Sequence, residues 1–387
     1  MHNRWAILAV LFVVRLTMAF QFQSVAAVAP LLGTSFGVSL ADIGLLIGLY
    51  FTPGIALALP GGAIGQRFGD KMTVLAALAL MLIGGLMMAL SDSWTVQMAG
   101  RLIAGAGGVL LNVQMTKMVA DWFAGREIAT AMAIFVNSWP AGIAISLLTL
   151  PAIGTAWGVS AVYFAVAALI GLAIVLLVAG YQSPPNAAAV SGATARFDRN
   201  ALVAVIVAGL LWGIYNIGFA MIFSFGPLLL VERGWSIAAA GSTISIVLWL
   251  AALAGPAGGF LADRTNRPQT ILVGGCIVFA LLMLTLPRTG AVLLTVIALG
   301  LVCALPSGPI MSLPARVLQP STRAIGMGVF YTVYYTPMML GPFVAGALAK
   351  STGTTATAID FGAAMLLACP LLLWAFNRIA AARTHSA

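Results

Sequence analysis

Residues 5–32 read WAILAVLFVVRLTMAFQFQSVAAVAPLL, and a single charged side chain, Arg15, interrupts this otherwise uncharged run. An α-helix needs about 20 apolar residues to cross the hydrocarbon core of a bilayer, so the run is long enough to span one. It also continues well past the length of a signal-peptide core. The segment therefore predicts a membrane-spanning helix with an arginine inside it.

The rest of the chain has the same apolar character. Of its 387 residues, 62% are hydrophobic and 7% are charged, whereas soluble domains carry about 25% charged residues. Because the apolar runs are continuous rather than alternating, they predict helices and not a barrel. We therefore expect an all-α membrane protein with twelve transmembrane helices. The twelve runs are Trp5–Leu32, Ile43–Ile64, Met72–Leu90, Thr95–Val119, Ile128–Leu150, Val159–Tyr181, Ala201–Leu230, Ile237–Leu261, Thr270–Leu286, Ala291–Leu313, Ala324–Ala349 and Ile359–Phe376.

The net charge of +9 indicates a membrane topology rather than nucleic-acid binding, because the basic residues are unevenly distributed. With the N-terminus inside, thirteen of the 18 Lys and Arg residues fall on the cytoplasmic side. Only Arg233, Arg288 and Lys350 fall outside, and Arg15 and Arg101 lie within spans. We expect a multi-pass protein of a bacterial inner membrane with both termini in the cytoplasm. Its surroundings are the lipid bilayer, and we expect no nucleic-acid partner.

Two six-helix halves are separated by the longest polar break. Residues 182–200, QSPPNAAAVSGATARFDRN, read as a flexible linker. GAIGQRFGDK at 62–71 and GFLADRTNRP at 259–268 follow the second and eighth spans, 197 residues apart, and MAIF at 132–135 has a similarly spaced partner, MGVF at 327–330. Parallel repeats of this kind place a binding site at the repeat interface in one class of transporters. The expected units are a bundle at 1–181, a linker at 182–200 and a bundle at 201–387.

The second of these loops resembles the loop signature of the major facilitator superfamily, a glycine followed by an Asp-Arg pair and further basic residues. The matching positions are Gly259, Asp263, Arg264 and Arg267. The resemblance covers nearly the whole chain. It implies the major facilitator fold, in which spans one, four, seven and ten line a central cavity and the loop residues act in gating.

The first loop matches the same signature at Gly62, Arg67, Gly69 and Lys71, and departs from it at two positions. Gln66 stands where the family usually has Asp, and Asp70 stands where a basic residue is usual. The sequence RFGDK is similar to what the nitrate/nitrite-type and cyanate-permease-like branches carry. For the basic loop residues, simple obedience to the positive-inside rule is the alternative explanation.

Arg15 is the strongest functional candidate. It lies ten residues from Trp5, about 15 Å along a helix, near the middle of a core about 30 Å thick. A charge there costs roughly 2.5–3.5 kcal/mol, so a compensating environment must exist. None of the nine acidic residues lies at that depth. We therefore predict that Arg15, and with it Arg101 about 10 Å into its own span, faces a cavity that attracts anions. The alternative is that backbone carbonyls and Gln or Asn side chains hold both arginines.

Other site candidates follow from helical spacing. In the fourth span Arg101, Gly105, Gly108 and Asn112 share one face, where the glycines leave room beside the charge; close helix packing is the alternative. The family resemblance implies that Arg15, Arg101, Trp212, Asn216 and Ser307 gather around the cavity. The predicted substrate-binding residues are Arg15, Arg101, Asn112, Phe22, Gln23, Trp212, Tyr215, Asn216, Tyr334 and Tyr335.

These features predict a secondary active or facilitative transporter that moves a small anion, either an inorganic or cyanate-like ion or a carboxylate, by alternating access. The alternative is an exporter of neutral or lipophilic compounds. An enzyme or sensor is disfavoured, because no nucleotide-binding loop, metal cluster or nucleophile–base pair is evident. We expect no cofactor or metal, and Cys276, Cys303 and Cys369 are most simply packing residues. Because no span carries an internal Asp, Glu or His, we expect exchange, uniport, or symport with the proton on the substrate. Nothing requires more than a monomer.

Overall fold

The computed structural model describes residues 3–123, 128–182, 198–318 and 323–384, and these residues form helices with no strand. A membrane offers no water to the backbone, so each apolar run satisfies its own amides as a helix. The elements are α1 (Arg4–Ala26), α2 (Ala29–Phe36), α3 (Leu40–Leu49), α4 (Thr52–Phe68), α5 (Asp70–Ala89), α6 (Trp94–Trp122), α7 (Ile128–Val136), α8 (Ser138–Gly180), α9 (Arg199–Glu232), α10 (Ile237–Thr265), α11 (Pro268–Thr285), α12 (Val292–Val302), α13 (Ser307–Ser312), the 3-10 turn η1 (Pro314–Arg316), α14 (Arg323–Thr352) and α15 (Ala356–Thr384).

The predicted twelve spans are confirmed. Ten stretches of the described chain are long and apolar enough to cross a membrane. One of them, Ile134–Gly180, has 47 residues and turns back at Gly158, whose φ of 84° lies in the region that favours glycine. It therefore makes two crossings, and the thirty-residue helix α14 completes the set.

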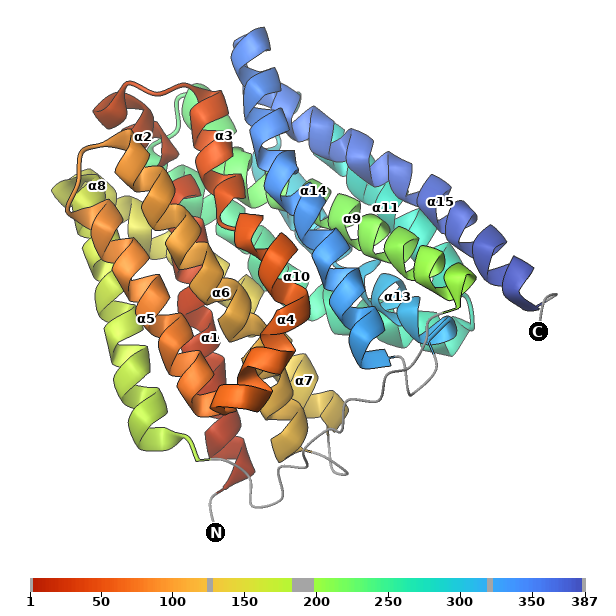
Figure 1. The fold of residues 1–387 in the computed structure, drawn as a ribbon. Coiled ribbons are helices and arrows are strands. Elements are labelled where there is room, and N and C mark those ends of the chain that lie inside the picture. The colour runs from red at the N-terminus through yellow and green to blue at the C-terminus, as the bar shows by residue number, and fades with distance from the viewer. Residues whose placement is uncertain (1–2, 124–127, 183–197, 319–322, 385–387) are drawn as a thin grey trace.

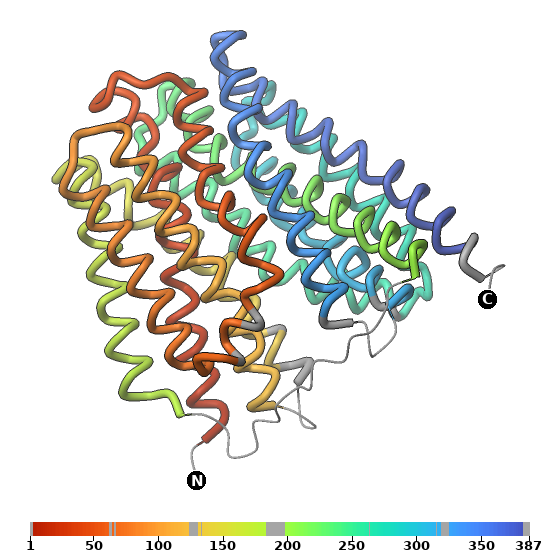
Figure 2. The backbone as a smooth tube through the Cα atoms, in the orientation of Figure 1, coloured from red at the N-terminus to blue at the C-terminus, as the bar shows by residue number. Residues whose placement is uncertain are grey.

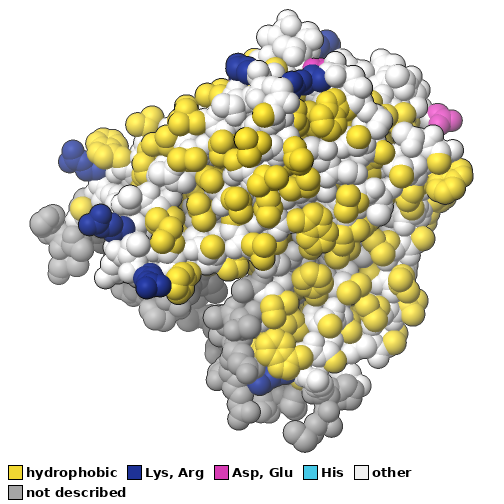
Figure 3. All heavy atoms as spheres, turned by 180° about the vertical axis from the view of Figure 1, so that it is seen from behind, with side chains coloured by type: hydrophobic (Ala, Val, Ile, Leu, Met, Phe, Trp, Pro, Cys, Tyr) yellow, Lys and Arg dark blue, Asp and Glu magenta, His cyan; other side chains and the backbone are white. Residues whose placement is uncertain are grey.

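The helices form two bundles that lean together, with the N-terminus at the bottom of the view and the C-terminus at its right side, below mid-height (Figure 1). The tube in Figure 2 shows α14, in blue, running beside the orange segment that contains α3 and α4. Hydrophobic side chains cover the middle of the face seen in Figure 3, and lysines and arginines lie at its edges. This surface is what a bilayer-embedded protein requires. We call the end that carries the chain termini the terminal end and the opposite end the distal end.

Four predicted spans are not continuous helices, which corrects the expectation of uninterrupted runs. The first is divided between α1 and α2 at Ala27 and Val28. The second is divided between α3 and α4 at Tyr50 and Phe51. The fifth is divided between α7 and α8 at Asn137, and the tenth between α12 and α13. Irregular backbone at membrane depth is tolerated only where protein or a cavity surrounds it. Residues 183–197 of the predicted linker fall outside the described residues, so the proposed bundle boundaries stay a prediction.

Glycines hold the two bundles together in the distal half. A Cβ on Gly44 would lie 2.1 Å from the Pro342 carbonyl oxygen, and one on Gly48 would lie 2.1 Å from the Met339 oxygen. From the other bundle, a Cβ on Gly346 would lie 2.3 Å from the oxygen of Leu40. Only a residue without a side chain allows backbones to approach this closely. The distal part of α14 is therefore closed onto α3.

Candidate functional site

Arg15 lies in the middle of α1 and is 9% exposed. Its Nε and Nη2 atoms donate to the side-chain oxygen of Asn112 on α6, at 3.2 and 3.0 Å. Its Nη1 atom donates to the carbonyls of Phe135 and Val136, both at 3.1 Å, and to the Ser138 hydroxyl at 3.0 Å. The guanidinium carbon also lies 4.7 Å from the centre of the Phe135 ring. Within the described residues Arg15 pairs with no carboxylate.

The break between α7 and α8 explains why carbonyls are available to Arg15. In a continuous helix the Val136 carbonyl would accept from the amide of the fourth residue onward. That residue is Pro140, which has no N–H and displaces the preceding turn. The Phe135 carbonyl, in the same turn, accepts a hydrogen bond from the Ser138 hydroxyl at 2.6 Å. The sequence NSWP therefore creates the acceptors that receive the Nη1 atom of Arg15.

Asn112 connects Arg15 to the opposite bundle. The Tyr335 hydroxyl of α14 lies within hydrogen-bonding reach of the Asn112 side chain. Tyr331, Tyr334 and Tyr335 all lie in the neighbourhood of Arg15. The Tyr335 ring in turn rests on Gly54 of α4, where an added Cβ would lie 2.3 Å from it. The structure thus brings together three predicted site residues, one from each of α1, α6 and α14.

Arg101 is enclosed differently. It is completely buried, and its three nitrogens donate to the carbonyls of Leu46 at 3.1 Å and of Gln21 and Phe22 at 2.6 Å each. The Tyr50 ring covers it at 4.7 Å from the guanidinium carbon. All these partners belong to α1, α3 and the turn that follows α3. This geometry is the alternative that the sequence left open for Arg101, and its predicted contact with substrate stays a prediction.

The glycine face of α6 does not open a space beside Arg101. A Cβ on Gly105 would lie 2.2 Å from the Tyr50 carbonyl oxygen, and one on Gly108 would lie 2.5 Å from the Tyr50 hydroxyl. Tyr50 itself is 1% exposed. The expectation that these glycines leave a cavity is therefore wrong, because the room they leave is filled by a tyrosine.

Aromatic rings link the two bundles around this region. Phe22 lies 4.9 Å from Phe51, measured between ring centres, and Phe51 lies 6.1 Å from Tyr335. Tyr335 contacts Tyr334 at 5.0 Å, and Tyr334 lies 6.3 Å from Trp212 of α9. Rings at these separations attract one another in tilted and edge-on arrangements. Phe22, Trp212, Tyr334 and Tyr335, all predicted site residues, thus belong to one connected aromatic cluster.

The remaining predicted residues have partners of their own. Gln23 donates to the Phe223 carbonyl at 2.7 Å, which joins α1 to α9. The Tyr215 hydroxyl donates to the Cys303 carbonyl at 2.6 Å, and Asn216 donates to the Trp212 carbonyl at 2.7 Å. Ser307, expected near the cavity, donates to the Ala304 carbonyl at 2.6 Å. Tyr215 therefore bridges α9 to the broken tenth span.

Several buried oxygen atoms near the bundle interface make no hydrogen bond within the described part of the chain. They are Oε1 of Gln23, Oγ1 of Thr52, Oγ of Ser224 and Oγ1 of Thr332. A buried polar atom without a partner costs about 1–3 kcal/mol, so such atoms are expected to meet water or a ligand. They offer acceptors and hydroxyl donors between α1, α4, α9 and α14.

The first signature loop is fixed within the N-terminal bundle. Gly69 adopts a φ of 84°, which allows the tight connection from α4 to α5. Lys117 of α6 pairs with Asp70 at 2.7 Å and with Asp121 at 2.8 Å. Lys71 donates to the carbonyls of Val178 and Tyr181 at 3.0 and 2.8 Å, capping the end of α8. Asp70, which departs from the family signature, thus has a specific basic partner.

Other residues of the two signatures make weaker contacts. Arg67 stacks beside Phe68, and Arg264 beside Phe260, with guanidinium carbons 5.5 and 5.9 Å from the ring centres. Gly62 lies in α4 and Gly259 in α10, and the Asp263 side chain falls outside the described residues. Their predicted role in gating stays a prediction.

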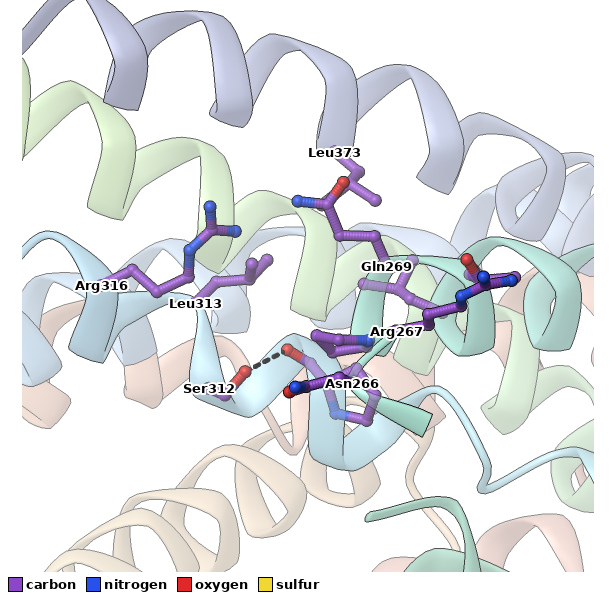
Figure 4. A pocket seen from close by; sticks show the side chains of 11 residues that line it. Asn266, Arg267, Gln269, Ser312, Leu313, Arg316 and Leu373 are labelled. Carbon is purple, nitrogen blue, oxygen red and sulfur yellow. Dashed lines mark hydrogen bonds between the residues drawn. The ribbon is translucent and has the colours of Figure 1, made fainter. Parts of the chain in front are cut away.

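A cavity of about 400 Å³ lies at the terminal end of the C-terminal bundle, away from Arg15. Arg267, Gln269, Ser312 and Arg316 are among its lining residues. In Figure 4 the Arg316 and Arg267 side chains extend to opposite sides of it. The cavity is built from one bundle only, whereas the Arg15 cluster uses both. A site that alternates between two bundles needs contacts with both, so we place the candidate site at Arg15.

Sequence reasoning missed several residues that shape the site. Ser138 and the carbonyls of Phe135 and Val136 follow from Pro140, which was a visible signal in the sequence. Phe51 and Gly54, which receive Tyr335, carry no such signal. Lys117 could have been paired with Asp121 from its spacing of four residues on a helix.

Comparison with known proteins gives a consistent identity. The family model described as Major Facilitator Superfamily matches residues 11–335 and 208–386. The hexuronate transporter of Bacillus subtilis (strain 168) is 24% identical over 379 residues, covering 90% of this chain and 87% of the relative. The 3-(3-hydroxy-phenyl)propionate transporter of Escherichia coli (strain K12) is 24% identical over 359 residues, covering 89% of this chain and 87% of the relative.

The fold comparison agrees with the family match. The inward-open xylose transporter from E. coli superimposes with a TM-score of 0.78 at 14% identity, over 97% of this chain and 96% of that one. A likeness at this identity shows the fold alone. The family match shows that the protein is a transporter and not an enzyme. The chain belongs to the Major Facilitator Superfamily.

Proposed function

We propose that this protein transports a small carboxylate by alternating access, with Arg15 as the residue that binds the carboxylate group. The observation that carries the proposal is the position of Arg15. It is a buried guanidinium in the middle of a span and lies close to three tyrosines of the opposite bundle, and its hydrogen-bond partners among the described residues are all neutral. Neutral partners satisfy its N–H groups but leave its charge uncompensated, and an anionic substrate would compensate it.

The same cluster suggests two kinds of carboxylate. Phe22, Phe51 and Tyr335 offer ring faces, and the unpaired oxygens of Gln23 and Thr52 offer hydrogen bonds to hydroxyl groups. Two relatives carry names that match these chemistries, a hexuronate transporter and a 3-(3-hydroxy-phenyl)propionate transporter. We therefore propose a sugar acid or a hydroxylated aromatic acid ahead of an inorganic anion. The location we propose is the bacterial inner membrane, as a monomer with both termini in the cytoplasm.

One observation favours a different substrate. Every nitrogen of Arg15 and of Arg101 already has a hydrogen-bond acceptor within the N-terminal bundle. If both arginines only support the fold, the aromatic cluster would serve a neutral or lipophilic compound instead. The two functions differ in what Arg15 contributes to binding.

The test is thermal stabilisation of the purified protein by a panel of compounds. The panel contains glucuronate, 3-(3-hydroxyphenyl)propionate, lactate, nitrate and cyanate, with glucose and 3-(3-hydroxyphenyl)propanol as uncharged counterparts. We expect a carboxylate to raise the melting temperature of the wild type, its uncharged counterpart to do so much less, and Arg15→Gln to remove the shift. Stabilisation by the uncharged compounds alone would contradict the proposal and favour the neutral substrate.

A further inference from the structure

The Asn112 side-chain oxygen occupies the edge of the Arg15 guanidinium that a carboxylate would use. It accepts from both Nε and Nη2, at 3.2 and 3.0 Å, while Nη1 is turned toward the break between α7 and α8. Arginine binds a carboxylate through two parallel N–H···O bonds. Asn112 offers one neutral oxygen to the two N–H groups. It therefore lacks the negative charge and the second acceptor oxygen that a carboxylate would bring to the same position.

The surroundings of Arg15 make the lack of a negative charge at this position costly. Arg15 has no carboxylate partner within the described residues and is 9% exposed. The cost of burying a charge is offset only when a counter-charge and good hydrogen bonds are both present. Asn112 and the helix-break carbonyls supply the hydrogen bonds but not the counter-charge. A carboxylate arriving at the Nε and Nη2 edge would supply both.

Asn112 also has a second contact, which leads to the other bundle. The Tyr335 hydroxyl of α14 lies within hydrogen-bonding reach of the Asn112 side chain. Tyr335 is 2% exposed, and its ring is fitted against Gly54 of α4. A change at Asn112 therefore reaches a residue that holds the two bundles in contact.

We propose that Asn112 is a placeholder for the substrate carboxylate, and that binding exchanges the Arg15–Asn112 hydrogen bonds for an Arg15–carboxylate pair. Asn112 then withdraws from the guanidinium and its contact with Tyr335 changes, which couples occupancy of the site to the interface between the bundles. This inference rests on the proposed carboxylate function. It assigns Asn112 a positioning role that opposes binding rather than a direct contact with substrate.

Two substitutions at Asn112 give opposite expectations. Asn112→Asp places a permanent carboxylate on Arg15, so it should raise the melting temperature of the ligand-free protein and lower the affinity for an added carboxylate by about 30-fold or more. Asn112→Ala removes the competing acceptor, so it should raise that affinity by about 3- to 10-fold. Dissociation constants for glucuronate and 3-(3-hydroxyphenyl)propionate would be measured by titrated thermal stabilisation and by isothermal calorimetry. Asn200→Asp, in the first turn of α9, controls for one added negative charge.

The outcomes separate this inference from the proposed function. A weaker-binding Asn112→Asp together with a tighter-binding Asn112→Ala supports the exchange. If Asn112→Ala weakens binding, Asn112 is a direct ligand and the inference is overturned, while the carboxylate function stands. Wild-type affinity in a well-folded Asn112→Asp overturns it as well. If Asn112→Asp does not fold, the direction of the Asn112→Ala change decides. If neither carboxylate binds the wild type, the proposed function fails and the inference fails with it.

Discussion

Arg15 and Arg101 are both buried guanidinium groups in transmembrane helices, yet they are held in different ways. Arg101 donates to three backbone carbonyls of α1 and α3 and is sealed by Tyr50, all within one bundle. Arg15 donates to a carbonyl at a helix break and to a side-chain amide, and it lies near tyrosines of the other bundle. A backbone carbonyl moves only together with its helix, whereas an amide side chain can rotate away by itself. From this difference we propose that Arg101 supports the fold and that Arg15 binds substrate.

The largest expected effect separates the two arginines by stability. Arg101→Leu leaves the carbonyls of Gln21, Phe22 and Leu46 buried without its donors, and we expect a loss of about 3 kcal/mol or more. Arg15→Leu should cost less, because two of the Arg15 hydrogen bonds go to the Asn112 side chain, which can turn away, whereas the Arg101 acceptors are backbone carbonyls. Unfolding of the ligand-free proteins in detergent measures both. Equal losses would remove the distinction.

The next effect concerns binding. Arg15→Lys keeps the positive charge but loses the fork that faces Asn112, so carboxylate affinity should fall by about 10-fold or more. The ligand-free stability should change much less than in Arg101→Leu. Calorimetric titration with glucuronate and 3-(3-hydroxyphenyl)propionate gives the affinities. Full affinity in Arg15→Lys would mean that a point charge suffices and that the guanidinium edge has no special role.

A third prediction tests how tightly the Arg101 side of the molecule is packed. Gly105→Ala places a Cβ 2.2 Å from the Tyr50 carbonyl oxygen and should destabilise the protein by about 1–3 kcal/mol. Gly171→Ala is the matched control, because a Cβ there meets nothing within 4 Å. The melting temperatures of the two variants, compared with wild type, give the answer. A tolerated Gly105→Ala would show that the α6 face has room after all.

The smallest effect is expected at the surface. Arg288 forms two hydrogen bonds to Asp360, both 2.7 Å long, but the Arg288 side chain is 57% exposed. Exposed pairs contribute about 0–1 kcal/mol, and salt screens them. Arg288→Ala should therefore lower stability only slightly at low ionic strength and not at all in high salt. A loss of stability as large as that of Arg101→Leu would show that burial does not determine how much these arginines contribute to stability.

The fold could be predicted from the sequence because the bilayer imposes a simple rule. Each long apolar run had to become a helix, and the run count and the repeat gave the architecture. The positions of the helix breaks were harder to predict from the sequence. Pro140 accompanies a break, while Pro151 and Pro227 lie inside helices that continue past them. Whether a proline interrupts a span depends on the neighbours that satisfy the freed carbonyls, and those neighbours come from tertiary packing.

The site was predicted in part for the same reason. Composition placed Arg15 at mid-span without a carboxylate, and helical spacing put Asn112 on the face shared with Arg101. The hydrogen bonds between Arg15 and Asn112 join residues 97 positions apart, and nothing in either helix alone specifies them. The carbonyl partners of Arg101 were equally hidden, because every residue carries a carbonyl and only packing decides which ones meet a guanidinium.

The most direct test of the central claim is to locate a bound carboxylate. Crystals of the protein soaked with 3-(3-bromophenyl)propionate would reveal the bromine by anomalous scattering and the carboxylate by its density. The account predicts the carboxylate against Nε and Nη2 of Arg15, the ring among Phe22, Phe51 and Tyr335, and the Asn112 oxygen displaced. A carboxylate in the cavity beside Arg316, with the Arg15–Asn112 hydrogen bonds intact, would contradict it.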